Sequence, residues 1–370
     1  MNTTIDDRPT AAIGAAVSAE EREALRDSVA DLLRRRGGMD AVRAASTRPG
    51  RTDDALWATL CTEIGVAALP IPEDHDGAGA SFAETAVVLE ELGRALSPVP
   101  AFSTALATAA VLLSRDEAVA ADVLPRIAAG EISATVCWAA SSGWDISGVS
   151  AEGGLLSGTA HYVVDGESAD LFVVLAGGSG RDLTLHVVPA NSDGVLVEAL
   201  PTVDPTRPLA RVSFADTPAQ ALGSAGDLPA RLRSYAWALL ACEQVGGAQA
   251  ALDLSVEYAK VRKQFGRSIG SFQALKHRMA DMYVLVESAR SLARAAIDAV
   301  VAGAPDAETL AASAHVYCSD AFSSVTGDAI QIHGGIGITW EHDIHLYFKR
   351  AQGSSQLFGQ PHEALLLLRP

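Results

Sequence analysis

Hydrophobic positions along the chain follow three successive patterns. In residues 19–125 apolar side chains recur every three or four residues, as in EREALRDSVADLLRRR and FAETAVVLEELGRAL, which is typical of amphipathic helices. Residues 126–224 carry short runs rich in Val, Leu and Thr, such as LFVVLAG and LTLHVVPA, which predict a small antiparallel β-domain. Residues 225–370 return to helical spacing and are apolar on almost all faces. We therefore expect three domains with these bounds, preceded by a polar segment of about 17 residues for which disorder is expected.

Composition and charge narrow the classes of ligand. The chain has 370 residues, of which 49% are hydrophobic and 20% charged, and its formal net charge is -17. Such a field repels nucleic acid and anionic lipid, so neither is expected as a partner, and a polyphosphate ligand would need a local basic cluster. The cysteines, Cys61, Cys137, Cys242 and Cys318, show neither metal-ligand spacing nor a disulfide framework. Because we find no signal peptide and no apolar run long enough to cross a membrane, we expect a cytoplasmic protein.

The most informative segment is YAKVRKQFGRSIGSFQALKH, residues 258–277. It joins two long apolar helices through a short basic turn, in which Arg262, Lys263 and Arg267 surround Phe265. Fixed cations, free backbone N–H groups and a helix N-terminus together favour the binding of an anion such as phosphate or pyrophosphate. The turn is therefore a candidate polyphosphate clamp.

A second segment, QIHGGIGITWEHDIHLY, covers residues 331–347. It places Gly334, Gly335 and Gly337 at the predicted end of a helix. Glycine at such an end accepts a left-handed backbone and lets a ligand approach the main chain without interference from a Cβ atom. This segment is therefore a second candidate binding turn.

Together, in this order and at this separation, the two segments resemble the acyl-CoA dehydrogenase family of flavoproteins. Residues 65–79 and 85–100 are similar to the family's N-terminal helical domain, residues 158–176 to its middle β-domain, and residues 243–260 to the first long helix of its C-terminal bundle. The resemblance implies a mostly α fold with a central β-domain: an N-terminal helical domain, a small antiparallel β-barrel and a C-terminal four-helix bundle. Heteromeric acyl-CoA dehydrogenases of actinobacteria that degrade steroid side chains are the branch that the chain resembles in particular.

The resemblance implies FAD as the cofactor. Arg262, Gln264 and Phe265 match the family's Arg-x-[Gln/Thr]-Phe pattern, which contacts the pyrophosphate and the flavin edge of an FAD held by the neighbouring subunit. In the alternative interpretation, Arg262 caps the C-terminus of a helix and Phe265 belongs to the core.

The second turn is implied to contact the same FAD. Gln331, Gly334 and Gly335 match the family's Gln-x-x-Gly-Gly segment, whose backbone receives the adenosine-diphosphate half of the cofactor. Alternatively, the glycine pair only ends a helix. Because the family shares its flavin across a subunit interface, we expect a homo- or hetero-oligomer, and we favour α2β2.

Several side chains of the second segment could be read as metal ligands: His333, Glu341, His342, Asp343 and His345. The last two histidines lie three residues apart, close to one helical turn. A carboxylate-bridged bundle would need a second Glu-x-x-His partner, which the sequence lacks. We therefore expect no metal, and treat these side chains as solvated or hydrogen-bonded.

Two departures from the family pattern concern the flavin site of this chain itself. The family's β-domain loop Thr-Glu-Pro-x-[Ala/Gly]-Gly-Ser-Asp is replaced by WAASSGWD, residues 138–145. The family's Trp-[Ile/Val]-[Thr/Ser]-Asn becomes YVVD, residues 162–165, in which Val164 cannot donate the hydrogen bond made near flavin N5. We expect this chain to lack part of the usual flavin contact set.

The family's catalytic glutamate is missing from its usual places. A Tyr-Glu-Gly-Thr type segment is replaced by QLFGQ, residues 356–360, and the alternative position on the first bundle helix falls at Ala236. Glu243, two helical turns further along the same face, is the candidate base, because a buried glutamate without a cationic neighbour would have a raised pKa suited to removing an α-proton. Alternatively, Glu243 is a structural carboxylate bonded to the backbone or to an arginine across the interface.

These residues predict an acyl-CoA dehydrogenase subunit that takes part in FAD-dependent α,β-desaturation of an acyl-CoA thioester, within a heteromeric complex. Electron-transfer flavoprotein is the electron acceptor that the resemblance implies. One alternative is an enzyme of the same fold that acts on a carrier-protein thioester or runs a different flavin reaction in secondary metabolism. Another is a non-catalytic subunit that supports its partner. The acyl group stays open, because pocket depth depends on side chains spread over several helices.

Overall fold

The computed structural model describes residues 17–177, 183–224 and 226–368. Almost all of the N-terminal segment for which we expect disorder lies outside these residues. The described chain begins with helices: α1 (Ala19–Arg36), α2 (Met39–Ala45), α3 (Asp54–Thr59), α4 (Phe82–Arg94), α5 (Ala101–Ser114) and α6 (Glu117–Ala128). Ser18 and Ser81 start α1 and α4 with capping boxes, in which Glu21 and Glu84 accept from the backbone N–H of the cap residue.

Two four-stranded sheets follow. The first has the order β1 (Ala134–Cys137), β4 (Leu171–Ala176), β5 (Thr184–Pro189) and β8 (Gln220–Ser224). The second has the order β2 (Val149–Glu152), β3 (Leu155–Val164), β7 (Leu209–Pro218) and β6 (Val195–Leu200). Phe172 of β4 and Phe214 of β7 pack edge to face, with ring centroids 6.3 Å apart, and so belong to a core shared by both sheets.

One strand pair differs from the expected antiparallel arrangement. β1 pairs with β4 in parallel, from Ala134 beside Leu171 to Cys137 beside Val174, whereas the other pairs of the two sheets are antiparallel. Between β1 and β4 the chain runs through β2 and β3 of the second sheet, and such a crossover is what a parallel pair requires. The alternation of apolar and polar residues along a single strand carries no information about whether that strand pairs in a parallel or an antiparallel direction.

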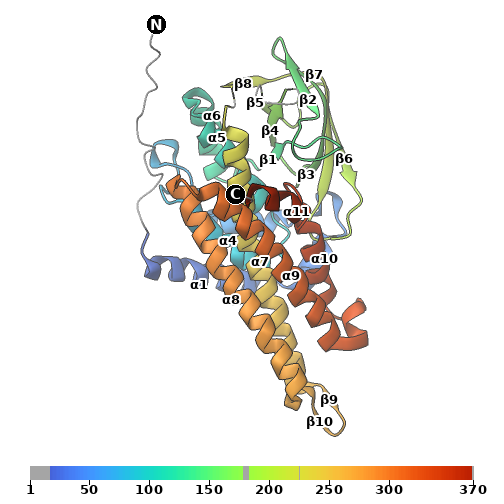
Figure 1. The fold of residues 1–370 in the computed structure, drawn as a ribbon. Coiled ribbons are helices and arrows are strands. Elements are labelled where there is room, and N and C mark those ends of the chain that lie inside the picture. Colours follow the sequence, from blue (N-terminus) through green and yellow to red (C-terminus); the bar gives the residue numbers. More distant parts are fainter. Residues whose placement is uncertain (1–16, 178–182, 225, 369–370) are drawn as a thin grey trace.

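The rest of the chain is helical again. Its long helices are α7 (Leu228–Val261), α8 (Gln273–Ala302), α9 (Ala307–His333) and α10 (Ile344–Ser354), followed by the short α11 (Pro361–Ala364). A hairpin of β9 (Lys263–Gln264) and β10 (Arg267–Ser268) joins α7 to α8 at the tip of this bundle (Figure 1). Short helical turns complete the fold: η1 (Pro49–Arg51), η2 (Leu60–Ile64), η3 (Glu73–His75), η4 (Ile269–Ser271), η5 (Gly334–Ile338) and η6 (Leu365–Leu368).

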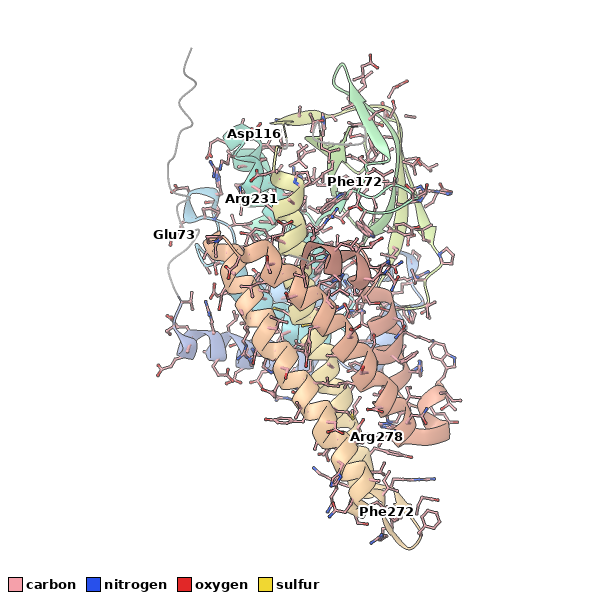
Figure 2. The ribbon with its side chains drawn as sticks, in the orientation of Figure 1. Glu73, Asp116, Phe172, Arg231, Phe272 and Arg278 are labelled. Carbon is pink, nitrogen blue, oxygen red and sulfur yellow. The ribbon has the colours of Figure 1, made fainter. Side chains whose placement is uncertain are left out.

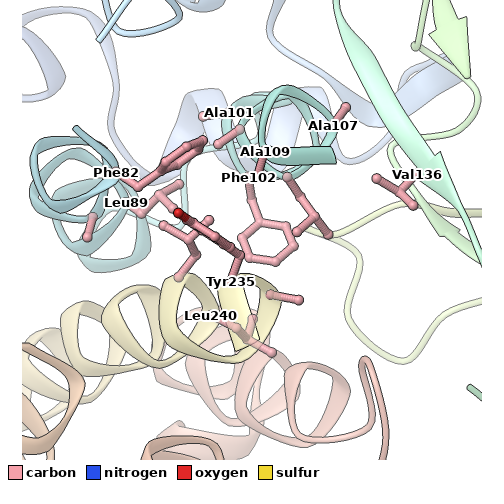
Figure 3. Packing of buried hydrophobic residues seen from close by; sticks show 14 of the residues in the cluster. Phe82, Leu89, Ala101, Phe102, Ala107, Ala109, Val136, Tyr235 and Leu240 are labelled. Atoms are coloured by element: carbon pink, nitrogen blue, oxygen red, sulfur yellow. The ribbon is translucent and has the colours of Figure 1, made fainter. Parts of the chain in front are cut away.

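α4 and α5 pack against α7, so that the N-terminal helices and the bundle share one core. Phe82 of α4 meets Tyr235 of α7 edge to face, with ring centroids 4.9 Å apart (Figure 3). A Cβ atom on Gly93 would lie 2.2 Å from the carbonyl oxygen of Glu243, and one on Gly246 would lie 1.8 Å from that of Glu90. The backbones of α4 and α7 therefore cross at a distance that only glycine permits.

The expected fold, mostly α with a central β region and a C-terminal helical bundle, is confirmed. No helix within the described residues combines the length and the hydrophobicity needed to span a bilayer.

Candidate functional site

The hairpin between α7 and α8 presents the first predicted binding turn to solvent. Arg262 ends α7, and its backbone N–H donates to the carbonyl of Tyr258 over 2.9 Å. Phe265 and Gly266 form the two-residue loop, with φ of 52° and 78°, which is the geometry of a type I′ turn. The Phe265 side chain is 91% exposed, so the alternative of a core residue is wrong.

A phenylalanine in a left-handed turn is unusual, because asparagine, aspartate or glycine adopts this conformation at lower cost. The ring has little packing in the chain itself: it meets Phe272 edge to face at 6.2 Å, and Arg267 stacks on that same Phe272 ring at 4.1 Å. Figure 2 shows Phe272 at the tip of the bundle. The Arg262 side chain is exposed and makes no ion pair within the described residues. An exposed cation and an exposed ring on a fixed hairpin are suited to a ligand or partner outside this chain.

The second predicted turn lies where α9 ends. Gly334 follows the last helical residue with φ of 63° and ψ of -142°, a conformation that favours glycine. Gln331, Gly334 and Gly335 are all exposed, and a Cβ atom on Gly335 would meet nothing within 4 Å. The turn does end a helix, as the alternative interpretation proposed, but the space over Gly335 is also open to a ligand.

Tyr258 connects these two turns. Its backbone carbonyl accepts from the N–H of Arg262, and its hydroxyl donates to the carbonyl of His333 over 3.4 Å. Its ring also stacks on His333, with centroids 4.4 Å apart. The structure therefore brings both sequence-predicted turns to the same end of the bundle, joined through one residue whose backbone meets the hairpin and whose side chain meets the end of α9.

Glu243 lies elsewhere, in the middle of α7, and its surroundings differ from those expected. Arg207 donates to both of its carboxylate oxygens, and Arg350 Nη1 donates to Glu243 Oε1 over 2.8 Å. The expected absence of a cationic neighbour is wrong. Burial alone would raise the pKa of Glu243, but the two arginines outweigh burial and lower that pKa. The expected raised pKa is therefore wrong as well.

Further buried polar groups complete this ionic cluster. Arg350 Nε donates to Asp204 over 2.6 Å, and its Nη2 donates to the carbonyl and the hydroxyl of Thr206. Asp165, at the end of β3, accepts a 2.7 Å bond from the hydroxyl of Ser103 on α5. Burial raises the pKa of Asp165 to about 6, against the opposing influence of the nearby arginines. The cluster thus joins α5, the β region, α7 and α10.

The segment that carries the base in related proteins is held tightly against the bundle. The backbone φ of Phe358 is 61°, a strained conformation for an aromatic residue. Trp237 Nε1 donates to the carbonyl of Phe358 over 3.1 Å, and His315 Nε2 lies 2.8 Å from the carbonyl of Gly359. Burial lowers the pKa of His315 to about 4, so its neutral ring donates this bond. Phe358 is thereby locked in place.

Aromatic side chains surround Phe358. Its ring lies 4.7 Å from Trp144, 5.7 Å from Phe102 and 6.3 Å from Trp138 between centroids. Arg233 of α7 holds the loop that contains Trp144, since it donates to the carbonyl of that residue over 3.0 Å and stacks over Trp138. The replaced β-domain loop and the replaced base segment therefore meet, and what fills the space between them is packed aromatic rings.

Val164, where the family pattern has a hydroxyl, lies inside the protein. Its side chain is buried, and its carbonyl accepts a 2.6 Å bond from the hydroxyl of Thr135. Arg207, Arg350 and Phe358 were not singled out from the sequence. No local signal marks Arg350, which follows Lys349 in the mixed sequence of α10, and only the fold shows which carboxylates it meets.

The fold defines a class of protein in which a helical N-terminal part, a β region and a long helical bundle succeed one another. Models of the N-terminal and C-terminal domains of acyl-CoA dehydrogenase match residues 19–131 and 235–362. The acyl-CoA dehydrogenase IpdE2 of Mycolicibacterium smegmatis is 43% identical over 348 residues, which cover 94% of this chain and 97% of that protein. The chain belongs to the acyl-CoA dehydrogenase family of oxidoreductases.

Solved structures agree with this assignment. A variant of the Tcur3481–Tcur3483 steroid ACAD has a TM-score of 0.86 and 29% identity, and the match covers 94% of this chain and 96% of that one. The ChsE4–ChsE5 complex of Mycobacterium tuberculosis has a TM-score of 0.87 and 25% identity, with 95% and 97% covered. Each of these structures is named for a pair of chains.

Proposed function

We propose that this chain is one subunit of a heteromeric, FAD-dependent acyl-CoA dehydrogenase that introduces an α,β double bond into an acyl-CoA thioester. The similarity to two proteins that are named as pairs supports a heteromer, for which we propose α2β2. The similarity to the Tcur3481–Tcur3483 protein, which is named a steroid ACAD, supports an acyl group derived from a steroid. We propose electron-transfer flavoprotein as the electron acceptor. We also propose that the chain divides into three domains, at residues 19–125, 126–224 and 225–370.

In this proposal the two turns at the tip of the bundle hold the nucleotide half of an FAD whose flavin lies in the partner subunit. Arg262 and the hairpin N–H groups suit the pyrophosphate, and the open backbone at Gly334 and Gly335 suits the adenosine side. Gln264 and Phe265 are exposed beside them, available to the flavin edge. When bound, FAD accepts the hydride that leaves the β-carbon of the acyl group.

The residues of this chain do not fit a flavin and thioester of its own. A carboxylate that removes an α-proton must be free to receive it, whereas Glu243 is held by two arginines that favour its ionised form. Phe358 occupies the base segment, and Trp144 packs on its ring. This observation carries the proposal that the partner supplies the catalytic carboxylate, while this chain binds and orients the nucleotide.

The test is to express the chain alone and together with a related family subunit from the same genome. We expect the chain alone to lack flavin, and the pair to carry one FAD for each two chains. Adding an acyl-CoA should bleach the flavin of the pair, faster with a steroid-derived thioester than with butyryl-CoA.

Two outcomes would contradict the proposal. A yellow homomer that bleaches with acyl-CoA would show that the chain is a complete enzyme. A flavin-containing pair that ignores every acyl-CoA but reacts with a carrier-protein thioester would support the alternative substrate class.

A further inference from the structure

A stack of three aromatic rings lies between the two nucleotide-binding turns. Tyr258 of α7 stacks on His333 at the end of α9, with centroids 4.4 Å apart and planes at 25°. His333 in turn lies 4.3 Å from His342, which precedes α10, with the two ring planes tilted by 54°. We call these three contacting rings the Tyr258–His333–His342 stack, although only the first pair is close to parallel. The inference drawn from this stack rests on the proposed function of the two turns.

Hydrogen bonds fix the proton positions of both imidazoles. His333 Nδ1 lies 2.7 Å from the carbonyl of Ala329, so this nitrogen carries a proton and donates. Its Nε2 is buried and has no partner within the described residues, and the residue is only 3% exposed. His342 Nδ1 accepts from the backbone N–H of Ile344 over 3.1 Å, so this nitrogen is unprotonated. Both rings are therefore neutral in this geometry.

A second proton would disrupt each bond pattern. On His333 it would create a buried N–H without an acceptor, and on His342 it would turn the acceptor for Ile344 into a donor. Burial is the main cause that lowers the pKa of both rings. The bond to Ala329 opposes this shift for His333, and the charge of Asp343 opposes it for His342, but neither reverses it.

The charged groups that face the stack compensate such a charge only in part, through Asp343 beside His342. Arg43 of α2 reaches the carbonyl of His342 and binds Asp343 over 2.8 Å, so the nearest carboxylate is already paired. From α10, Lys349 stacks over the exposed Trp340 ring, which His345 also contacts. Tyr258 is the only group of α7 in the stack. No cluster of His, Cys, Asp and Glu suited to a metal occurs in the part of the chain that the structure describes.

We propose that the Tyr258–His333–His342 stack is a positioning element, which fixes the glycine turn relative to the Arg262 hairpin and releases it in acid. Tyr258 is a positioning residue because it acts on the ligand only through the two turns. While both imidazoles are neutral, the stack holds His333 in place. Gly334, the next residue, is therefore held at a set distance from Arg262. Once protonated, a buried ring must leave the stack to reach water, and the glycine turn moves with it.

The first test measures the Kd of FAD for the flavin-free heteromeric complex at pH 8. Tyr258→Phe keeps the ring and loses the hydroxyl bond, so Kd should rise roughly two- to tenfold. Tyr258→Leu removes the stack, and Kd should rise further. The matched control is Tyr317→Leu on α9, a partly buried tyrosine packed on the main core, which should leave Kd unchanged.

A double-mutant cycle separates positioning from general loss of structure. If Tyr258 acts by aligning the hairpin with the glycine turn, Tyr258→Leu and Arg262→Ala should together raise Kd by less than the product of their single effects. Independent, multiplicative effects would overturn the proposal. The proposed function itself fails in a different way, namely if Arg262→Ala alone leaves flavin binding unchanged.

The second test follows Kd between pH 8 and pH 5. If a histidine must lose a proton before FAD binds, Kd should rise about tenfold for each pH unit below the pKa of that histidine in the flavin-free complex. His333→Phe and His342→Phe should each reduce this slope, whereas His362→Gln, at an exposed histidine, should not. Titration calorimetry on the wild-type complex in two buffers counts the same protons without any substitution. A Kd that does not change between pH 8 and pH 5, or a calorimetric proton count of zero throughout that range, would overturn the proposal.

Discussion

Replacing Glu243 with glutamine distinguishes a structural carboxylate from a catalytic base. The substitution keeps the size of the side chain and removes its charge. Arg207 then loses a charged partner on both carboxylate oxygens, and Arg350 loses one of its two carboxylates but keeps Asp204. Glutamine keeps one acceptor oxygen, whereas its NH2 group is a donor that faces an arginine donor.

The expected loss in the free energy of unfolding follows from the charges that remain in the variant. Breaking a buried ion pair costs about 3 to 5 kcal/mol when one charge is left uncompensated. In the variant, two arginines face Asp204 and Asp165, and the second of these has a pKa of about 6 in the intact protein. At pH 7.5 Asp165 is ionised and compensates in part, so we expect a loss of about 2 kcal/mol in the free energy of unfolding. The substitution also removes the influence by which Glu243 raises the pKa of Asp165, a relief that matters only where Asp165 is ionised in the intact protein. This relief is smaller at pH 5 than at pH 7.5, and the expected loss grows to about 3 kcal/mol.

The assay combines denaturant unfolding with flavin bleaching in a complex with the wild-type partner. Glu243→Gln should lower stability, more at pH 5 than at pH 7.5, and bleach at the wild-type rate with acyl-CoA. Glu198→Gln is the matched control, since it removes the same charge from an exposed pair with Arg211 and should change neither property. Unchanged stability together with lost bleaching would refute this reasoning and make Glu243 the base.

Three other predictions concern the same features. Asp165 holds its proton more tightly in the folded chain, with a pKa of about 6 against 3.8, so its contribution to stability is present at low pH and is lost as pH rises through 6. Asp165→Asn should therefore raise the free energy of unfolding by up to about 3 kcal/mol at pH 7.5 and by little at pH 4, and equal effects at both would contradict the assignment. Arg262→Ala should weaken FAD binding in the complex roughly ten- to hundredfold in a fluorescence titration, while Arg34→Ala, at an exposed pair, leaves it unchanged. Light scattering at micromolar concentration should show an oligomer, and a stable monomer would contradict the expected oligomeric state.

The sequence by itself determined which segments are helical, which are strands and where the two binding turns lie. These properties are local: apolar periodicity reports the face that an element buries, and glycine reports where the backbone needs a left-handed turn. The exposed Phe265 at a basic hairpin and the pair Gly334–Gly335 after α9 could be recognised for this reason. The resemblance carried by these same segments then predicted the family.

Only the tertiary structure decided what surrounds Glu243. Arg207 lies 36 residues before it and Arg350 lies 107 residues after it, on a loop and on a helix whose spacing gives no hint of either contact. An apolar run around a glutamate predicts burial correctly, but the direction of its pKa shift depends on charges that the fold brings from elsewhere.

The same holds for the segment of Phe358 and for the parallel pair of β1 and β4. Trp144 lies far from Phe358 in sequence, yet their rings pack at 4.7 Å, so two separate departures from the family pattern become one filled site. Strand direction within a sheet likewise depends on the path of the chain between strands, which alternation along each strand does not record. Local physics fixes the elements, whereas the chemistry of a buried group is set by neighbours that only folding brings together.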